Sequence, residues 1–377
     1  MKVLRAFRTE LDPSKSQADL FGRCAGASRY VYNWGLAEWE RQHKAGEKPS
    51  QYGLRKQFNA IKDQTCPWIR DLPYAVTESA FGRLGAAFEN FFRRVKNGEK
   101  PGYPKFKKRG RNASFQIRGV KIERSRVRIT GAGWVKLKER GYIPAEAERY
   151  GIYATISERA KRWYISVLVE QEIDDPGNPA GAPLGIDLGI KDLAVCSDGT
   201  VFENSKVLNK AEKRLKRLQR ELSRRKKGGK NREKTKDQLA RAHKKVSDIR
   251  SHQLHNISHS VTFHKQPSVI VLENLNVKGM VANHHLARAI SDASFGELRR
   301  QIEYKAKWMG AEVLIADRFY ASSKTCSVCG TVKTELDLSE RVYNCDVCGY
   351  QGDRDYNAAC NLAALANRET HGDCLGS

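Results

Sequence analysis

The order of apolar and polar positions predicts a helical region near the N-terminus of the chain. Apolar residues recur at helical spacing over 20–37, and further helical stretches are expected over 51–64 and 76–95. The segment Asp12-Pro13-Ser14 is typical of a helix start, because proline tolerates the first turn and serine can cap it. Residues 1–11 alternate weakly and are expected to form a short strand.

From residue 115 to residue 172 the apolar period changes to two. Short alternating runs such as Phe115/Ile117 and Val127/Ile129 are separated by glycine-containing turns. This pattern indicates short strands and predicts a small β-barrel. The proline- and glycine-rich segment 174–179 is typical of a linker, so we expect a new domain to begin after it.

The second half of the chain predicts a mixed α/β layer. Three short strands come first, a long helical pair follows over 206–250, and strands and helices then alternate to the end. The expected later elements are a strand at 268–273, a helix at 295–309, a strand at 312–316 and a helix at 357–366. Because the order is β-β-β-α-β-α-β-α, we expect an RNase H-like α/β fold.

Net charge points to a polyanionic partner. The 377 residues contain 68 Lys and Arg against 43 Asp and Glu, which gives a formal charge of +25. Residues 206–250 alone hold 19 basic and five acidic side chains, more than helix pairing explains. Clustered positive charge is typical of nucleic-acid binding, because neutralised phosphates release counterions. A solvated basic surface is the alternative.

The segment 96–111 alternates aromatic and basic residues between prolines and glycines. Such a segment suits a groove for nucleic-acid backbone and stacked bases, and a solvated linker is the alternative. Together with the turn of the basic helical pair, it supplies the candidate nucleic-acid contacts, which are Lys105, Lys107, Lys108, Arg109, Arg224, Arg225, Lys226 and Lys227.

Three carboxylates occupy positions that are unfavourable for stability. Asp187 lies inside an apolar strand, Glu273 ends another, and Asp355 begins an apolar helix. Burying a charge costs several kcal/mol unless it is paired or binds metal. Three converging acids can hold two Mg²⁺ ions for phosphodiester hydrolysis. Taken singly, Glu273 could be a surface residue and Asp355 a helix cap, as could Asp353.

Four of the nine cysteines form two Cys-x-x-Cys pairs fifteen residues apart, Cys326 with Cys329 and Cys345 with Cys348. This spacing predicts a tetrahedral Zn²⁺ site without an open position for catalysis. The metal would be structural and would hold together an insertion too small to fold alone.

These motifs resemble TnpB, the OrfB-type family of transposon-encoded RNA-guided nucleases related to type V CRISPR effectors. The resemblance rests on Gly185-Ile186-Asp187-Leu188-Gly189-Ile190-Lys191-Asp192, Leu272-Glu273-Asn274-Leu275, 291–298, both cysteine pairs and Asp353-Arg354-Asp355-Tyr356-Asn357-Ala358-Ala359. Weaker N-terminal matches are Arg29-Tyr30-Val31-Tyr32-Asn33-Trp34, Phe91-Phe92-Arg93 and Gly102-Tyr103-Pro104-Lys105-Phe106.

The resemblance implies a multidomain α+β protein with a defined division of the chain. A β-barrel wedge domain (1–12 and 112–178) would carry an inserted helical recognition domain (13–111). A RuvC-like, RNase H-like nuclease domain (179–377) would follow, with the basic helical pair (206–264) and a four-cysteine zinc ribbon (320–350) inserted. Asp187, Glu273 and Asp355 match the family's metal-binding triad, so two Mg²⁺ and one structural Zn²⁺ are expected.

The implied function is RNA-guided DNA cleavage. A noncoding guide RNA would pair with a double-stranded DNA target beside a short duplex motif, for which Tyr52 of the helical domain is a candidate contact. There the protein reads backbone shape, while base pairing reads sequence. Two alternatives stay open, a nuclease-inactive RNA-guided DNA-binding regulator and an unguided DNA transposase or resolvase.

The expected setting is the prokaryotic cytoplasm, in association with the nucleoid, with the protein monomeric on its RNA. No stretch approaches the ~20 apolar residues of a spanning helix, and the first residues lack the apolar core of a secretion signal. The sequence does not specify the target-adjacent motif, the guide sequence or the cut positions.

Overall fold

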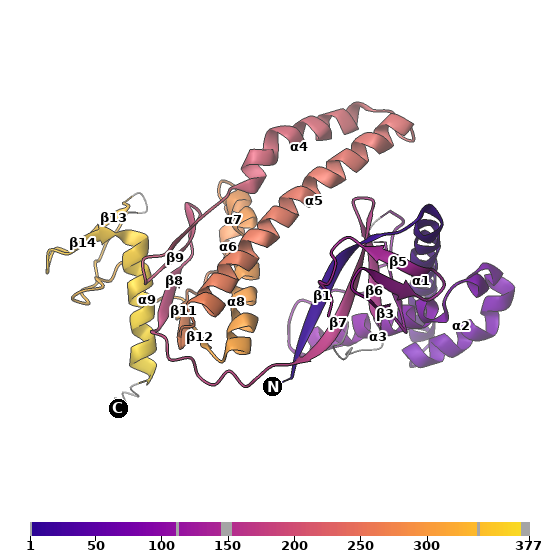
Figure 1. Cartoon of the computed structure of the whole chain (residues 1–377), viewed down its shortest axis with the longest axis horizontal. Coiled ribbons are helices and arrows are strands. Elements are labelled where there is room, and N and C mark those ends of the chain that lie inside the picture. The colour runs from indigo at the N-terminus through magenta and orange to yellow at the C-terminus, as the bar shows by residue number, and fades with distance from the viewer. Residues whose placement is uncertain (1, 111–112, 145–152, 338–339, 371–377) are drawn as a thin grey trace. The chain divides into compact units, whose positions relative to one another are not determined.

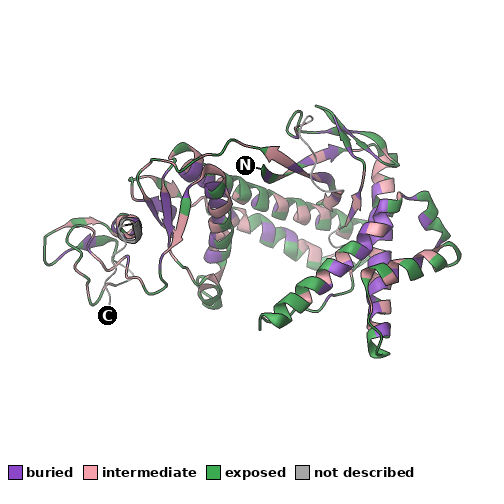
Figure 2. Ribbon diagram, turned by 90° about the horizontal axis from the view of Figure 1, so that it is seen from below, coloured by how far each residue is buried: buried purple, intermediate pink, exposed green. Residues whose placement is uncertain are grey.

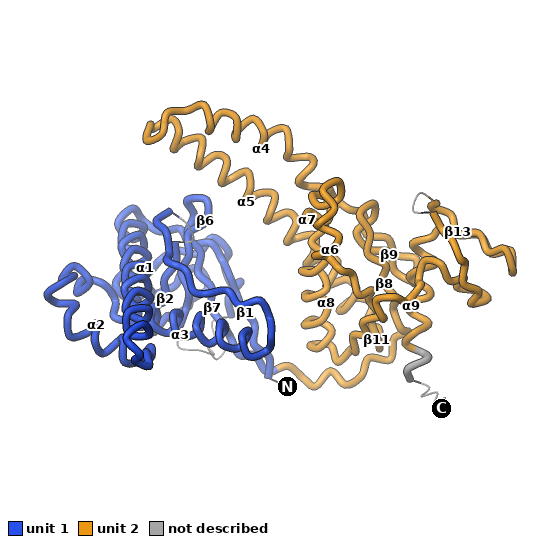
Figure 3. The backbone as a smooth tube through the Cα atoms, turned by 180° about the vertical axis from the view of Figure 1, so that it is seen from behind, with its two compact units in different colours: residues 1–172 blue, residues 173–377 orange. Residues whose placement is uncertain are grey.

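A computed structural model describes residues 2–110, 113–144, 153–337 and 340–370. The chain divides into two compact units, residues 1–172 and residues 173–377 (Figure 3). Within the described residues, no helix is long and apolar enough to cross a membrane.

The N-terminal unit begins with a strand and then three helices. The helix α1 begins after Ser14, whose hydroxyl accepts from the backbone N–H of Gln17, while the Gln17 side chain accepts from the Ser14 N–H. This reciprocal capping satisfies two N–H groups that a helix start leaves free. The elements are β1 (Lys2–Asp12), α1 (Lys15–Lys44), α2 (Gln51–Thr65), a 3₁₀ turn (Pro67–Asp71) and α3 (Tyr74–Lys96). The predicted strand and three helices are confirmed.

The remaining strands of this unit join β1 in one antiparallel seven-stranded sheet, in the order β2-β6-β7-β1-β5-β4-β3. The first strand pairs along its length with β7, from Lys2 opposite Glu172 to Leu11 opposite Trp163. The three helices are therefore inserted in the chain between β1 and β2, two strands of the same sheet that β6 and β7 separate. The strands are β2 (Ser114–Ile117), β3 (Lys121–Ile122), β4 (Arg126–Ile129), β5 (Gly133–Leu137), β6 (Ala154–Arg159) and β7 (Arg162–Glu172).

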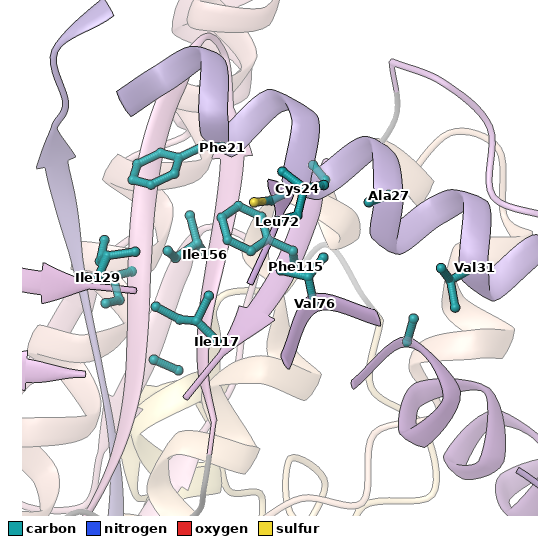
Figure 4. Packing of buried hydrophobic residues seen from close by; sticks show 14 of the residues in the cluster. Phe21, Cys24, Ala27, Val31, Leu72, Val76, Phe115, Ile117, Ile129 and Ile156 are labelled. Carbon is teal, nitrogen blue, oxygen red and sulfur yellow. The ribbon is translucent and has the colours of Figure 1, made fainter. Parts of the chain in front are cut away.

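One hydrophobic core joins the helices and the sheet of the N-terminal unit. Phe21 and Cys24 of α1 point toward Phe115 and Ile156 of the sheet (Figure 4). All four side chains are almost fully buried. Buried positions concentrate in the strands and along one side of the long helices, as helical periodicity requires (Figure 2).

The C-terminal unit is built on a five-stranded sheet in the order β10-β9-β8-β11-β12. The first three strands are antiparallel neighbours, and β8, β11 and β12 run parallel (Figure 1). The strands are β8 (Leu184–Asp187), β9 (Asp192–Cys196), β10 (Val201–Glu203), β11 (Val269–Leu272) and β12 (Glu312–Ile315). The strands and helices predicted for this half are present in the predicted order, with additional short elements between them.

Helices cover both faces of this sheet. Ile186, Ile270 and Leu272 pack in a cluster with residues of α5 and α8, while Val269 and Val271 pack against α9. Two short helices, α6 and α7, were not predicted. The helices are α4 (Val207–Arg224), α5 (Lys230–His259) with a π-helical end (Ser260–His264), α6 (Val277–Ala282), α7 (Ala287–Ala293), α8 (Phe295–Met309) and α9 (Arg354–Thr370).

Two insertions extend from this α/β core. The helices α4 and α5 run side by side as a hairpin, joined by Leu215, Leu218, Ala242 and Val246 (Figure 1). The second insertion lies between β12 and α9 and contains the hairpin of β13 (Val342–Asn344) and β14 (Gln351–Asp353). Because β14 ends where α9 begins, this hairpin leads directly into the helix that packs on the sheet.

Candidate active site

Asp187 is the last residue of β8 and lies on the strand face that α9 covers. Two residues earlier on the same face, Gly185 makes this packing possible. A Cβ at position 185 would lie 2.0 Å from the carbonyl oxygen of Ala359 and 2.4 Å from the backbone N of Ala363. Glycine therefore allows the backbone of α9 to approach the strand at the point that brings the helix to Asp187.

Glu273 follows directly after β11. In the parallel register, Val271 pairs with Gly185 and Leu272 with Ile186, so the next position on β11 lies beside Asp187. Alternation along the strand puts Glu273 on the same face as Val271, which is the face that α9 covers. The hydroxyl of Ser322 donates to Glu273 Oε1 at 2.5 Å, and this bond orients the carboxylate.

Asp355 comes from the first turn of α9. The neighbouring Asp353 caps this helix, since its Oδ1 accepts from the N–H groups of Asp355 at 2.9 Å and Tyr356 at 3.0 Å. The cap assigned to Asp353 as an alternative role is thus confirmed. Asp355 itself makes a 3.4 Å ion pair with Arg354.

The electrostatics of Asp187 show that these acids converge. Burial raises the pKa of Asp187 well above its ordinary value, and the like charges of Glu273 and then Asp355 raise it further. The charge of Arg354 opposes this effect. Carboxylates that destabilise one another in this way are typical of sites that bind cations.

The donor set fits hard divalent cations. All three groups offer carboxylate oxygens, which Mg²⁺ prefers. The three carboxylates do not bring three oxygens within 4.8 Å of one another. Within the described residues, only the four cysteines bring their ligand atoms this close together.

The cysteine cluster is built as a closed tetrahedral site. The Sγ atoms of Cys326 and Cys348 are 3.7 Å apart, and those of Cys329 and Cys345 are 3.5 Å apart. Four thiolates at the usual Zn–S distance of about 2.3 Å lie about 3.8 Å from one another, whereas disulfide sulfurs lie about 2.05 Å apart. Hydrogen bonds with Thr331 lower the pKa of Cys329 to about 6, whereas at Cys348 the Tyr350 backbone is outweighed by burial and the neighbouring thiols, which raise the pKa to about 12. The predicted four-cysteine cluster is confirmed, and it could hold one zinc ion.

Two buried asparagines connect this cluster to α9. Asn357 accepts from the N–H of Ser327 at 2.9 Å and donates to the carbonyl of Thr325 at 2.7 Å. One turn later, Asn361 donates to the carbonyls of Thr325 and Ser322 at 2.6 and 2.8 Å. The first cysteine pair is therefore fixed to the helix that carries Asp355.

The predicted nucleic-acid contacts fall in three places. Lys105, Lys107 and Lys108 line a cavity of about 460 Å³ in the N-terminal unit, and Arg109 is exposed just after them. Tyr52 is 72% exposed on α2.

The remaining candidates lie around the turn between α4 and α5. Arg224, Lys226 and Lys227 are exposed there. Arg225 is half-buried, forms an ion pair with Glu221 and donates to the carbonyl of Asn231 at 2.6 Å. The role of all these residues in binding stays a prediction.

Several residues at these sites were not identified from the sequence. Ser322 lies in an irregular segment, and its hydroxyl becomes informative only when the fold brings it 49 residues back along the chain to Glu273. Asn357 and Asn361 carried a usable signal, because buried amides one turn apart in an apolar helix require partners. Arg83 lines the lysine cavity but is indistinguishable in sequence from an exposed helical cation.

Three family models match the chain. The OrfB_IS605 model, described as "Probable transposase", matches residues 166–284, and a "Cas12f1-like, TNB domain" matches residues 295–362. A "Helix-turn-helix domain" of the same OrfB_IS605 series matches residues 1–48. Within the described part of that last stretch, the structure has one strand and one long helix, so a helix-turn-helix is not the local fold here.

Curated relatives match along almost the whole chain. "Putative RNA-guided DNA endonuclease InsQ" of Escherichia coli (strain K12) is 35% identical, with 97% of this chain and 93% of the relative covered. A "Putative RNA-guided DNA endonuclease" of Streptomyces pristinaespiralis is 33% identical, with 96% and 89% covered.

One solved structure supports the fold. The chain in "Cryo-EM structure of the Cas12f1-sgRNA-target DNA complex" aligns with a TM-score of 0.58 at 15% identity. The alignment covers 93% of this chain and 83% of that chain.

Proposed function

Because the chain belongs to the TnpB family of transposon-encoded RNA-guided DNA endonucleases, we propose that it cleaves double-stranded DNA under the direction of a noncoding guide RNA. The guide pairs with one target strand beside a short duplex motif, and a single RuvC-like site hydrolyses phosphodiesters. The observation that carries the chemical part of this proposal is the convergence of Asp187, Glu273 and Asp355 from two parallel strands and a helix start.

The proposed division of the chain follows the two sheets. Residues 1–12 and 112–178 form the wedge domain, whose seven strands we take to be the barrel, and residues 13–111 form the recognition domain inserted between its first two strands. Residues 179–377 form the RuvC-like nuclease domain. Its order, three antiparallel strands followed by two parallel ones, supports the RNase H-like assignment.

The triad residues have distinct positions in the proposed chemistry. Asp187, Glu273 and Asp355 would hold two Mg²⁺ ions, which activate water and stabilise the leaving oxygen when bound. Ser322 keeps Glu273 oriented, and Asp353 holds the first turn of α9 so that Asp355 faces the strand ends. Cys326, Cys329, Cys345 and Cys348 would hold the structural zinc of the ribbon.

The basic surfaces supply the RNA and DNA contacts in this proposal. The α4–α5 hairpin and the segment 96–111 would contact the guide–target heteroduplex through its backbone, and the protein would act as a monomer on its RNA. Retention of all three carboxylates favours an active nuclease over a regulator that only binds DNA.

The test of the chemistry is single-turnover cleavage of a supercoiled plasmid matched to the bound guide, with and without Mg²⁺. Asp187→Asn, Glu273→Gln and Asp355→Asn each remove one carboxylate charge and should each abolish cleavage while RNA binding is kept. Asp346→Asn is the matched control, because its side chain is 81% exposed in the ribbon. Cleavage by Asp187→Asn at the rate of the unchanged protein would show that the triad assignment is wrong.

A further inference from the structure

The cavity that contains three of the predicted lysines also contains two cations that were not predicted to act there. Arg29 of α1 and Arg83 of α3 line it together with Lys105, Lys107 and Lys108. Its volume, about 460 Å³, lies in the range of ~300–1,000 Å³ that is usual for ligand sites. Five cations thus converge on one concavity from two helices and one extended segment.

The cavity is held in shape by a specific contact between the segment and α1. Asn33 donates to the carbonyl of Lys107 at 3.0 Å and accepts from its N–H at 2.8 Å. These paired bonds fix an otherwise irregular segment and place the Lys107 ammonium 3.7 Å from the centre of the Tyr32 ring. The lysine is therefore positioned by the fold and is not a free surface charge.

The two inner cations lack compensating anions. In the part of the chain that the structure describes, no carboxylate contributes to the electrostatics of Arg83 or Lys107, and neither forms an ion pair. The guanidinium of Arg83 donates to Ser28, and at 3.4 Å to Ser114, but its Nε is buried without a hydrogen-bond partner. Burial and, to a lesser extent, the charge of Arg83 together lower the pKa of Lys107 to about 7.

Arg83 and Lys107 are each half-buried, and their positive charges repel one another without a carboxylate between them, so an anion that contacts both would be stabilised there. We propose that this cavity is a built site for one phosphodiester group of a nucleic-acid backbone, held by Arg83 and Lys107 and flanked by Arg29, Lys105 and Lys108. A phosphate group has several acceptor oxygens. It can therefore accept two hydrogen bonds from the guanidinium of Arg83 and also contact the ammonium of Lys107. Phe106, 49% exposed at the cavity, lies where an adjoining base can stack.

This inference rests on the proposed function only in taking the anion to be a nucleic-acid phosphate. The inference is more specific than a basic surface. On a basic surface, every cation contributes a little to the salt dependence of nucleic-acid binding. At a built site, removal of one inner cation removes one whole phosphate contact from that dependence. Guide RNA and target DNA carry the same phosphodiester, so the experiment has one arm for each.

The test measures binding of a fluorescein-labelled single-stranded RNA from the chain's own locus, and of a labelled duplex DNA, across a series of salt concentrations without Mg²⁺. Lys107→Gln should reduce the slope of log K against log salt by about 0.7 in the RNA arm or about 0.9 in the DNA arm, which is one phosphate contact. Arg83→Gln should do the same. The double variant should lose no more than either single variant, since both cations hold the same phosphate.

Arg41→Gln is the matched control, because it removes one positive charge from α1 outside the cavity, where Arg41 is already paired with Glu38 at 2.7 Å. Its slope should stay unchanged. Thermal unfolding of the nucleic-acid-free variants separates binding from structure, since removal of an uncompensated cation should leave the melting temperature of Lys107→Gln equal or higher.

Unchanged slopes in both arms for folded Lys107→Gln and Arg83→Gln would overturn the inference. A lower melting temperature with unchanged slopes would likewise assign Arg83 and Lys107 to structure alone. A protein that binds neither probe would contradict the proposed function itself, and this outcome differs from binding with unaltered slopes.

Discussion

Gly185 sets how closely α9 approaches β8, so Gly185→Ala should misplace one acid of the triad. The added Cβ would lie 2.0 Å from the carbonyl oxygen of Ala359. Contacts below about 3.0 Å essentially do not occur, so the helix must move by about 1 Å at this point. Neither contact atom can rotate away, because both Ala359 O and Ala363 N belong to the helix backbone.

The shift is transmitted to Asp355, which lies one turn earlier on the same helix. A misplacement of about 1 Å can reduce a catalytic rate about 100-fold. Overpacking of this kind also lowers the free energy of unfolding by about 1–3 kcal/mol. We expect single-turnover plasmid cleavage to slow about 100-fold while the affinity for guide RNA is unchanged.

The matched control is Gly296→Ala in α8, where an added Cβ meets nothing within 4 Å. Alanine is a better helix former than glycine, so this variant should be as stable as the unchanged protein or more stable. If folded Gly185→Ala cleaves within threefold of the unchanged protein, the close packing of α9 does not position Asp355, and the geometric argument fails.

Three further predictions concern Asn357 at the cysteine cluster, Ser322 beside Glu273, and Lys107 in the N-terminal unit. Asn357→Leu leaves the N–H of Ser327 without its acceptor, which costs about 1–3 kcal/mol, so zinc release to a chelator should be about tenfold faster. Ser322→Ala removes the 2.5 Å bond to Glu273 and should slow cleavage about tenfold without weakening RNA binding. The third concerns Lys107, whose folded pKa of about 7 lies below its ordinary value of 10.5, so the unfolded chain binds more protons between these values. The free energy of unfolding should therefore rise with pH over that interval in the nucleic-acid-free protein, and less so in Lys107→Gln.

Each of these predictions has a result that would contradict it. For the ribbon, Ala364→Leu on the exposed side of α9 is the control, and equal zinc release from both variants would show that Asn357 does not fix the ribbon. If the Ser322→Ala protein cleaves at full rate, the hydrogen bond from Ser322 is not needed to orient Glu273. A pH profile that is identical in Lys107→Gln and the unchanged protein would show that Lys107 is not a buried cation in solution.

The sequence was informative where burial imposes a strong pattern. The apolar runs that become β8 and β11 predicted strands, and two acids stood out because Asp187 interrupts the first run and Glu273 ends the second. The spacing of the cysteine pairs likewise limited the possibilities to a metal cluster. In each case the pattern is local, so the residue and its neighbours in the sequence were enough to predict the strand or the metal cluster.

The features that could not be predicted depend on contacts between distant segments. Glycine at 185 is unremarkable in sequence, and its role appears only when α9 packs on it. The phosphate cavity needs Arg83 beside Lys107, which only the packing of α3 against the segment after it can provide. The short helices α6 and α7 lack sustained apolar periodicity, so no pattern indicated them.

The most direct test of the central claim uses the protein expressed with its own flanking locus and purified with the RNA that it retains. We expect one discrete noncoding RNA, and we expect the complex to cut, in the presence of Mg²⁺, only plasmids that carry a match to the guide end of that RNA beside a fixed short motif. A heterogeneous RNA pool would contradict RNA guidance. A discrete RNA with matched binding but no cutting would contradict nuclease activity.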